Sequence, residues 1–466
     1  MKRAALIILA ATIALFAMAV GWAAEPIPVG SRLELFVDRH LIDGLTGDAA
    51  LTLHKPAPRE VVFVADKPWE GNTSAYFTIF QDGDQYRMYY RGSHYDEKTR
   101  KFAHREVTCY AESKDGIHWT KPDLGLCEFD GSKQNNIVWD GVGTHNFTPF
   151  KDANPAGAPE AKYKALAGGE GKYKHGLYAL QSPDGIRWKL TRDEPVITAG
   201  DFDSQNLAFW DGARGRYADF HRKGREGVRD IMTCTSSDFL HWTEPVFLAY
   251  SGAPKEHLYT NAIQPYDRAP HILLGFPTRF LPTPAEQVEP TFMASRDGRT
   301  FHRWTEALIP VTAPENRDGN RSNYMTWGLV RLPGSDKEYS VYATEAYYRG
   351  PAGRLRRFTY RVDGFVSVRA SQRGELVTKP LVFEGNKLVV NFATKDQGHV
   401  RVEVQDADGK PVEGLALADC PAIRGDAIAH TVQWKSGPDV GRLAGKPVRL
   451  RFELADADLF AFQFTQ

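Results

Sequence analysis

Residues 113–119 read SKDGIHW, and related stretches recur as SPDGIRW at 182–188, SSDFLHW at 236–242 and the looser SRDGRTFHRW at 295–304. Their leading serines lie 69, 54 and 59 residues apart, a spacing that suits one repeated structural unit rather than a local motif. Each stretch follows a short run of alternating apolar and polar residues, which predicts a β-strand. The Asp-Gly pair predicts a tight turn, because glycine tolerates the positive φ that such a turn needs.

A second pattern of strand, polar turn and strand accompanies this repeat. It is found in five segments, which begin with YFTIFQDG at residue 76, NFTPF at 146, NLAFWDG at 206, NAIQPYD at 261 and WGLVRLPG at 327. Four strands repeated at this length predict a five-bladed β-propeller, which we place at residues 25–365. A strand from residues 50–65 would close the ring. A large irregular β-sandwich is the alternative, and the recurring turns favour the propeller.

The two ends of the chain differ from the repeats. Residues 366–466 contain alternating runs without a helical pattern, such as HVRVEVQDADGKPVEG at 399–414, and predict a C-terminal β-sandwich. At the N-terminus, Lys2 and Arg3 precede an apolar run that ends in small residues. We therefore expect residues 1–24 to be a cleaved signal peptide rather than an uncleaved anchor, and the mature protein to be periplasmic or extracellular.

Composition narrows the classes of partner. The chain has 58 basic and 58 acidic residues, so it offers no basic surface for nucleic acid. No second apolar run is long enough to cross a bilayer, and we expect no membrane contact after signal cleavage. The four cysteines show no metal-binding spacing, and we expect neither a metal nor a cofactor. A disulfide between Cys109 and Cys127 and free thiols are both compatible with the sequence.

Strand direction predicts where a ligand binds. In a four-stranded blade the Asp-Gly turns lie on one face of the ring, and we assign them a structural role. The opposite face carries the links that enter each innermost strand and the ends of the second strands. Glu70, Asp203 and Glu256 lie in these links and are our candidate catalytic residues, because cleavage of a glycosidic bond needs a proton donor and a second carboxylate. The residues expected to bind the carbohydrate are Trp69, Asn72, His94, His145, Asn146, Gln205, Asn206, His221, His257, Asn261, Arg279 and Glu345.

With these turns and links the chain resembles the five-bladed β-propeller glycoside hydrolases of families 32 and 43 and their relatives. The resemblance implies a glycosidase without a redox cofactor and, as in family 32, a C-terminal sandwich. Those families carry acidic residues at the start of blade one, of the third inner strand and of blade four, and Glu70, Asp203 and Glu256 occupy comparable positions. Glu256 would be the general acid and Glu70 the nucleophile or base. Asp203 would orient the substrate or stabilise the oxocarbenium-like state.

The chain also departs from the pattern of family 32. The segment Trp69-Glu70-Gly71-Asn72-Thr73 stands in place of Trp-x-Asn-Asp-Pro-Asn-Gly, Gln205 stands in the strict register of the family's aspartate, and His257 replaces a cysteine. These differences argue against an invertase. The sequence thus predicts an exported glycoside hydrolase that acts on a poly- or oligosaccharide. A non-catalytic carbohydrate-binding propeller is the alternative, and a lyase or sialidase-like enzyme that uses Arg91, Arg279 and Arg321 is a third possibility.

Overall fold

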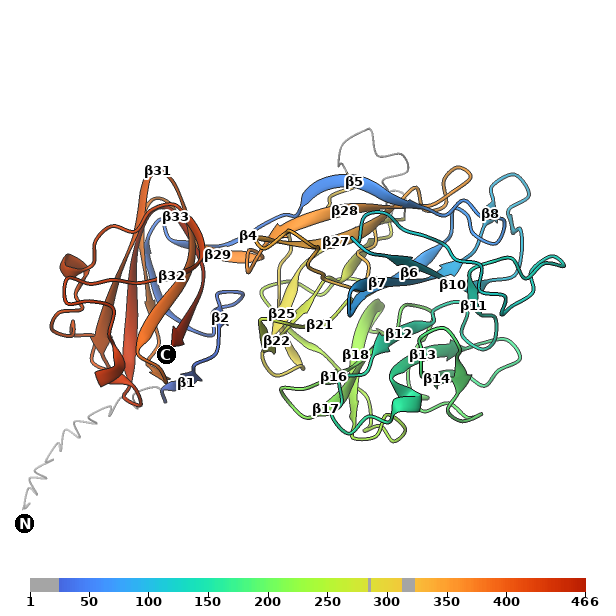
Figure 1. Cartoon of the computed structure of the whole chain (residues 1–466), viewed down its shortest axis with the longest axis horizontal. Coiled ribbons are helices and arrows are strands. Elements are labelled where there is room, and N and C mark those ends of the chain that lie inside the picture. Colours follow the sequence, from blue (N-terminus) through green and yellow to red (C-terminus); the bar gives the residue numbers. More distant parts are fainter. Residues whose placement is uncertain (1–24, 284–285, 312–322) are drawn as a thin grey trace, which may run out of the picture.

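The computed structural model describes residues 25–283, 286–311 and 323–466 (Figure 1). These residues form an all-β protein with five sheets arranged around a ring, which confirms the predicted fold class. The predicted signal peptide and Arg321 lie outside the described residues. Within the described ranges, no helix is long and apolar enough to cross a membrane. Strands from both ends of the chain form a second β domain beside the ring (Figure 1).

The first three blades are antiparallel meanders whose strands follow one another outward in sequence order. Blade I consists of β6 (Ala75–Asp82), β7 (Gln85–Gly92), β10 (Val107–Ser113) and β11 (Ile137–Trp139). Blade II consists of β12 (Thr148–Lys151), β13 (Tyr163–Gly169), β14 (Gly176–Ser182) and β15 (Lys189–Leu190). Blade III consists of β16 (Leu207–Asp211), β17 (Arg216–Arg225), β18 (Val228–Ser236) and β19 (Val246–Phe247).

Blades IV and V each include a strand that lies outside the simple meander. Blade IV consists of β21 (Gln264–Tyr266), β22 (Ala269–Gly275), β25 (Met293–Ser295), β26 (Thr300–Arg303) and the parallel edge strand β20 (Ala249–Ser251). Blade V consists of β27 (Glu338–Glu345), β28 (Arg354–Arg361) and β5 (Ala57–Val64). Because β5 pairs with β28, an early segment closes the ring, as the sequence predicts.

Short elements lie between the blade strands. Two hairpins connect the second and third strands of blades I and IV, namely β8 (Tyr95–Asp96) with β9 (Lys101–Phe102), and β23 (Thr278–Leu281) with β24 (Gln287–Pro290). Three 3-10 turns cover Pro159–Ala161, Leu417–Asp419 and Gly441–Leu443. The four cysteine thiols, all of them in the described ranges, are unbridged, so the structure has no Cys109–Cys127 disulfide.

The recurring Ser-x-Asp turns have the structural role that their spacing predicts. In the first, Ser113 accepts the amide of Gly116, and the Asp115 carboxylate accepts two further amides within the turn. The same bonds recur in the other three turns. Neighbouring blades contact the turns as well, because Tyr342 of blade V donates its hydroxyl to the Gly116 carbonyl. The turns therefore stabilise their own blade through bonds within the turn, and they also bind the neighbouring blade.

The second domain is a single hydrogen-bonded sheet of nine strands. Its C-terminal members are β29 (Val366–Thr378), β30 (Leu381–Phe383), β31 (Lys387–Asp406), β32 (Asp426–Thr431) and β33 (Val448–Thr465). Register shifts interrupt the long β31–β33 and β29–β33 ladders. The sheet encloses its own apolar core. Hydrogen bonds link all nine strands, and the C-terminal β-sandwich stays a prediction.

The N-terminal segment corrects the predicted domain boundary at residue 25. Residues 27–53 pair with the C-terminal strands rather than with the propeller, as β1 (Ile27–Gly30), β2 (Glu34–Leu35), β3 (Ile42–Gly47) and β4 (Ala50–Leu53). Alternation explains how this segment serves both parts: Leu35 and Val37 pack in the propeller core, and Phe36 packs in the core of the second domain. An ion pair between buried Glu34 and Arg296 of blade IV adds to this junction.

Candidate active site at one end of the propeller axis

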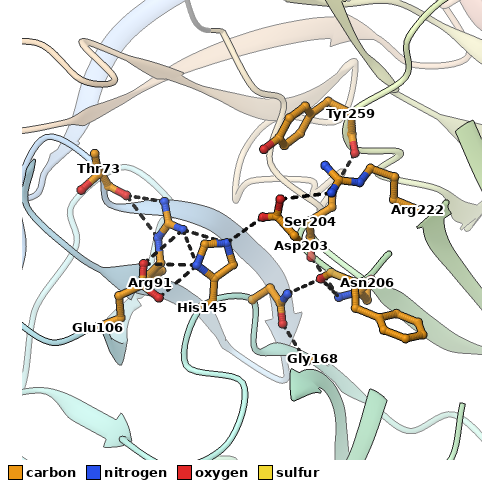
Figure 2. A network of polar contacts seen from close by, with 12 residues as sticks. Thr73, Arg91, Glu106, His145, Gly168, Asp203, Ser204, Asn206, Arg222 and Tyr259 are labelled. Carbon is orange, nitrogen blue, oxygen red and sulfur yellow. Dashed lines mark hydrogen bonds and ion pairs between the residues drawn. The ribbon is translucent and has the colours of Figure 1, made fainter. Parts of the chain in front are cut away.

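Charged side chains from three blades meet where the innermost strands begin (Figure 2). His145 precedes β12 and is central: its Nε2 lies 3.3 Å from an oxygen of Asp203, which precedes β16. The His145 Nδ1 lies 3.0 Å from a carboxylate oxygen of Glu106, just before β10. Arg222 of β17 donates to the other oxygen of Asp203 at 3.1 Å, and Arg91 of β7 lies against the ring of His145. Blades I, II and III thus share one polar network.

His145 has a partner in each of its protonation states. Its Nδ1 is 3.0 Å from Arg91, which can only donate, and equally close to Glu106, which can only accept when ionised. A neutral ring accepts from Arg91, and a protonated ring donates to Glu106. Burial opposes the charged ring, but hydrogen bonds to Asp203 and Glu106 outweigh it and raise the pKa of His145 above 6.5. His145 can therefore gain or lose a proton without being left unpaired.

Asp203 is the member of this network that faces solvent. Its side chain is 63% exposed, whereas that of Arg222 is 9% exposed. Partial desolvation would raise the pKa of Asp203, but hydrogen bonds and charge from His145 and Arg222 lower it to about 2. Asp203 is therefore an ionised carboxylate at neutral pH, held in place by two cationic side chains and accessible to a ligand.

Tyrosine rings surround these charges. The guanidinium of Arg91, which is 4% exposed, lies 4.9 Å from the ring centre of Tyr76 and donates to the hydroxyl of Tyr347 at 3.0 Å. Arg222 lies 5.1 Å from the ring centre of Tyr259. Tyr76 has a φ of 55°, a strained value for a residue with a side chain, and such strain is often found at functional sites. The site thus combines carboxylates with aromatic surface.

Further carboxylates line a cavity of 220 Å³ beside Asp203. The residues around it include Asn146, Gly168, Glu170, His175, Asp201 and Asp203. Glu170 follows β13, and its donor atom lies within 4.8 Å of those of Glu106 and His145. Four carboxylates, those of Glu106, Glu170, Asp201 and Asp203, therefore gather at this end of the axis.

The opposite end of the axis has a different character. A cavity of 740 Å³ lies where the innermost strands finish, and its wall is mostly apolar and aromatic. Its lining includes Phe80, Phe150, Phe209, Trp210, Pro265 and Trp327. No member of the His145–Asp203 network lines it. Asp267 and Lys151 also line this cavity, but the Asp203 network lies at the end at which the inner strands start.

Among the residues that the structure describes, two groups of potential metal ligands have their ligand atoms within 4.8 Å of one another, namely Glu106, His145 and Glu170, and Asp219, His221 and Cys234. In the first group, Arg91 already places a positive charge 3.0 Å from His145 Nδ1. In the second, His221 Nδ1 lies 2.5 Å from Asp219 Oδ2. This distance fits a shared proton, because two ligands about 2 Å from one zinc ion would lie farther apart. In both groups the histidine therefore already has a hydrogen-bond partner within the protein.

The three asparagines at the same register support loops. Asn146 donates to the carbonyl of Phe202 and accepts the amide of Gly168. Asn206 donates to the same Phe202 carbonyl, and Asn261 bonds to main-chain groups of its own surroundings. All three are buried. Asn146 and Asn206 position Asp203 through the link that contains Phe202, whereas Asn261 holds the start of blade IV against Phe220.

Gln205 is also buried and joins two blades. Its amide donates to the carbonyls of Tyr76 and Phe77 and to the hydroxyl of Thr78, at 3.2–3.3 Å. A residue of blade III therefore contacts β6 of blade I across the centre of the ring. Gln205 stabilises the inner strands beneath the network.

Glu70 lies away from this network. Its side chain has no exposed surface, and its oxygens accept from Lys121 Nζ at 2.6 Å, the Tyr90 hydroxyl at 2.5 Å and the Lys67 amide at 3.1 Å. None of these partners belongs to the Asp203 network. The geometry is that of a buried ion pair within blade I.

Glu256 is likewise occupied by ion pairs. Its two oxygens accept from Arg279 at 3.0 Å and from Arg303 at 2.5 Å. Arg279 also pairs with Glu289. This cluster joins the entry of blade IV to its β23–β24 hairpin, and the hydrogen bonds and ion pairs of Glu256 among the described residues go to Arg279 and Arg303 rather than to the Asp203 network. The structure does not bring Glu70, Asp203 and Glu256 together.

The predicted binding residues of blade I form local contacts. Trp69 donates its indole N–H to Asn136 at 2.7 Å. Asn72 bonds to both main-chain groups of Tyr95, and its own amide is 3.4 Å from a ring nitrogen of His94. Asn72 and His94 therefore hold the start of the β8–β9 hairpin.

The remaining predicted residues are also engaged within the fold. His221 is fully buried, bonds to Asp219 and donates to the carbonyl of Ala199. His257 accepts a main-chain amide. Glu345 is buried and accepts from Arg356 at 2.7 Å. Of the predicted set, His145 and Asp203 lie at the centre of the network, and Asn146 lines the adjoining cavity.

Sequence reasoning did not select Glu106, Glu170 or Tyr76. Glu106 and Glu170 lie between the second and third strands of blades I and II, on the ligand-binding face that strand direction predicts. Their position on this face was the feature of the sequence from which both residues could have been predicted. Their approach to His145 depends on how two blades are packed, which no local pattern specifies.

Comparison with protein families found no matching family model. Two curated proteins of Mycobacterium tuberculosis, "Uncharacterized protein MT1551" of strain CDC 1551 / Oshkosh and "Uncharacterized protein Rv1502" of strain ATCC 25618 / H37Rv, are each 30% identical over 139 residues. The match covers 29% of this chain and 40% of each relative. The chain therefore matches less than half the length of these relatives.

Solved structures with a similar arrangement include carbohydrate-active proteins of different reaction types. A "Glycoside hydrolase" is 17% identical with a TM-score of 0.46 and covers 65% of this chain and 92% of its own. An N-acetylgalactosamine deacetylase from F. plautii is 12% identical with a TM-score of 0.46, and the match covers 68% of this chain and 96% of that one. A β-1,2-mannobiose phosphorylase from Listeria innocua is 11% identical with a TM-score of 0.43, and the match covers 67% of this chain and 97% of that one. At these scores the likenesses carry no argument about the reaction of this chain.

Proposed function

We propose that this protein is an exported glycoside hydrolase whose catalytic centre is the Asp203 network. The observation that carries the proposal is the gathering of Glu170, Asp201 and Asp203 around one cavity, with Glu106 next to it against His145 and a tyrosine ring against Arg222. Carboxylates supply the acid and base that glycosidic cleavage requires, and aromatic rings pack against the apolar faces of sugars.

Asp203 and Glu170 are assigned the reacting roles. Asp203 is ionised above its pKa of about 2, so it accepts a proton from the attacking water or stabilises positive charge at the anomeric carbon. Glu170 faces the same cavity and is the proton donor to the leaving oxygen. His145 and Arg222 are positioning residues, because they fix both oxygens of Asp203.

The test is product release from a panel of soluble glycans and aryl glycosides by the purified mature chain. Asp203→Asn and Glu170→Gln should each lower kcat/KM by about a hundredfold or more, the range typical of acid–base groups. Asp193→Asn removes an exposed carboxylate elsewhere in blade II and should behave as wild type. Full activity in Asp203→Asn would contradict the assignment.

A non-catalytic carbohydrate-binding propeller is the second candidate. It is favoured by the burial or pairing of Glu70 and Glu256, the two acids that the family pattern associates with chemistry. Retained glycan binding without product release from any member of the panel would establish this candidate and refute hydrolysis.

A further inference from the structure

Phe102 is an exposed apolar side chain on the same face as the Asp203 network. It is 52% exposed and belongs to β9, in the hairpin that connects the second and third strands of blade I. Figure 1 shows this hairpin, marked by β8, at the edge of the ring. A single exposed apolar residue needs no explanation. Phe102, however, is the outer end of a continuous series of aromatic rings.

The series begins at the network, where Arg222 contacts both Asp203 and the ring of Tyr259. From there each ring contacts the next. The ring centres are 5.8 Å apart for Tyr259–Tyr324, 5.5 Å for Tyr324–Tyr347, 4.7 Å for Tyr347–Tyr348, 5.3 Å for Tyr348–Tyr95 and 5.5 Å for Tyr95–Phe102. We call these six residues the aromatic row. Its tyrosines are partly exposed and Phe102 is exposed, so each member of the row has some surface open to solvent.

Several contacts hold the aromatic row in place. Asn72 donates to the carbonyls of Tyr95 and Gly350 and so joins the hairpin to the loop after β27. In that loop, Ala346 and Tyr348 have φ values of 60° and 59°. Non-glycine residues in this region are strained, and the strain persists only where the surroundings enforce it. Tyr347 lies between these two residues and accepts a hydrogen bond from Arg91, which connects the row to the network.

We propose that the aromatic row binds a glycan chain that extends from the Asp203 network toward Phe102, so that the substrate is a polymer or long oligosaccharide. The inference rests on the proposed function for the class of ligand. The C–H faces of sugar rings are apolar and pack on aromatic surfaces, while tyrosine hydroxyls at the edge bond to sugar hydroxyls. Successive rings offer successive sugar units an apolar contact, and each contact adds to the affinity for a longer chain.

The experiment measures binding and product release for a disaccharide, a tetrasaccharide and a hexasaccharide of each of four series, derived from xylan, arabinan, laminarin and polygalacturonate. Calorimetric titration of the full mature chain gives Kd, and chromatography gives product. In the series that binds, Kd should fall as the chain lengthens. Phe102→Ala and Tyr95→Ala should weaken hexasaccharide binding by about fivefold, the size expected of one lost aromatic contact, and should weaken disaccharide binding by less.

Two further variants separate this role from a general effect. Phe102→Trp keeps an aromatic ring and should keep the dependence on chain length. Val64→Ala removes the other exposed large apolar side chain of the described residues, which is 42% exposed on β5, and should bind as wild type does. Because Phe102 and Val64 are both at the surface, neither substitution removes core packing.

The outcomes distinguish this proposal from the proposed function. Equal affinity for short and long chains, or an unchanged length dependence in Phe102→Ala, would overturn the role of the aromatic row while hydrolysis stands. Length-dependent binding without product release would support the row and refute hydrolysis. Failure of every series to bind would overturn both.

Discussion

Replacing Glu70 by glutamine separates a structural role of this residue from the catalytic role that its sequence position suggests. The carboxylate has no exposed surface and accepts from Lys121, Tyr90 and the amide of Lys67. Glutamine keeps the shape of the side chain but removes its charge. The Lys121 ammonium, which is 12% exposed, would then face a neutral amide.

The contacts set the size of the expected effect. Breaking a buried ion pair by removing one partner costs about 3–5 kcal/mol, because the other charge stays buried without compensation. Lys121 keeps two other acceptors, Asp66 at 2.9 Å and the Val64 carbonyl at 2.7 Å, and this places the loss at the lower end. We therefore expect Glu70→Gln to lower the free energy of unfolding by about 3 kcal/mol.

Urea unfolding followed by tryptophan fluorescence measures this loss. Glu194→Gln is the matched control, since Glu194 is 59% exposed and pairs with Lys174 at the surface, where such pairs contribute about 0–1 kcal/mol. The folded fraction of Glu70→Gln should retain the kcat of wild type on any substrate found. A variant as stable as wild type, but with kcat reduced a hundredfold, would refute the reasoning and restore Glu70 as a catalytic residue.

The remaining predictions concern His145 and Asp203 within the charge network and Glu256 outside it. The pKa of His145 is raised in the folded state, so its contribution to stability is complete below pH 6.5 and is lost as pH rises through the folded pKa. The difference in unfolding free energy between wild type and His145→Gln should therefore shrink toward alkaline pH, and a constant difference would contradict the raised pKa. The contribution of Asp203 to stability depends on pH in the opposite direction, because its pKa is lowered in the folded state. This contribution, which solvent screening reduces, is present above pH 3.8 and disappears as pH falls through about 2. Glu256→Gln should lower the free energy of unfolding, because Arg279 and Arg303 lose the carboxylate that they share. It should lower kcat by less than Asp203→Asn does. A larger loss of kcat than in Asp203→Asn would make Glu256, rather than Asp203, the catalytic residue.

Some features of the fold could be predicted because they depend on short segments. The Ser-x-Asp turns bond to amides within the same turn, so their spacing already indicated repeated blades. The strand predicted within residues 50–65 is β5, and its pairing with β28 closes the ring. Residues 27–53 were assigned to the propeller, whereas their strands pair with residues more than 300 positions away. Local alternation shows that a segment is a strand but does not identify its partner.

In the candidate site, too, local sequence predicts some features, and contacts between distant segments decide the others. Strand direction predicts the same face of the ring for His145, Asp203, Glu70 and Glu256, and it does not distinguish between them. The side chain of Glu70 is instead turned toward Lys121, and that of Glu256 toward Arg279 and Arg303. A position at the start of an inner strand thus indicates a face of the ring but not the direction of a side chain.

The sequence by itself determined the repeated blade, its turns and the face that carries the charged links, because these follow from hydrogen bonds and periodicity within about sixty residues. Only the tertiary structure decided which charges act together. Glu106 comes from the connection between the second and third strands of blade I, and His145 and Asp203 come from the links into blades II and III, so their contact depends on the packing of these three blades around the axis. Electrostatic interaction falls off with distance and with exposure to water, so the chemistry of these side chains is set by neighbours that are distant in the chain.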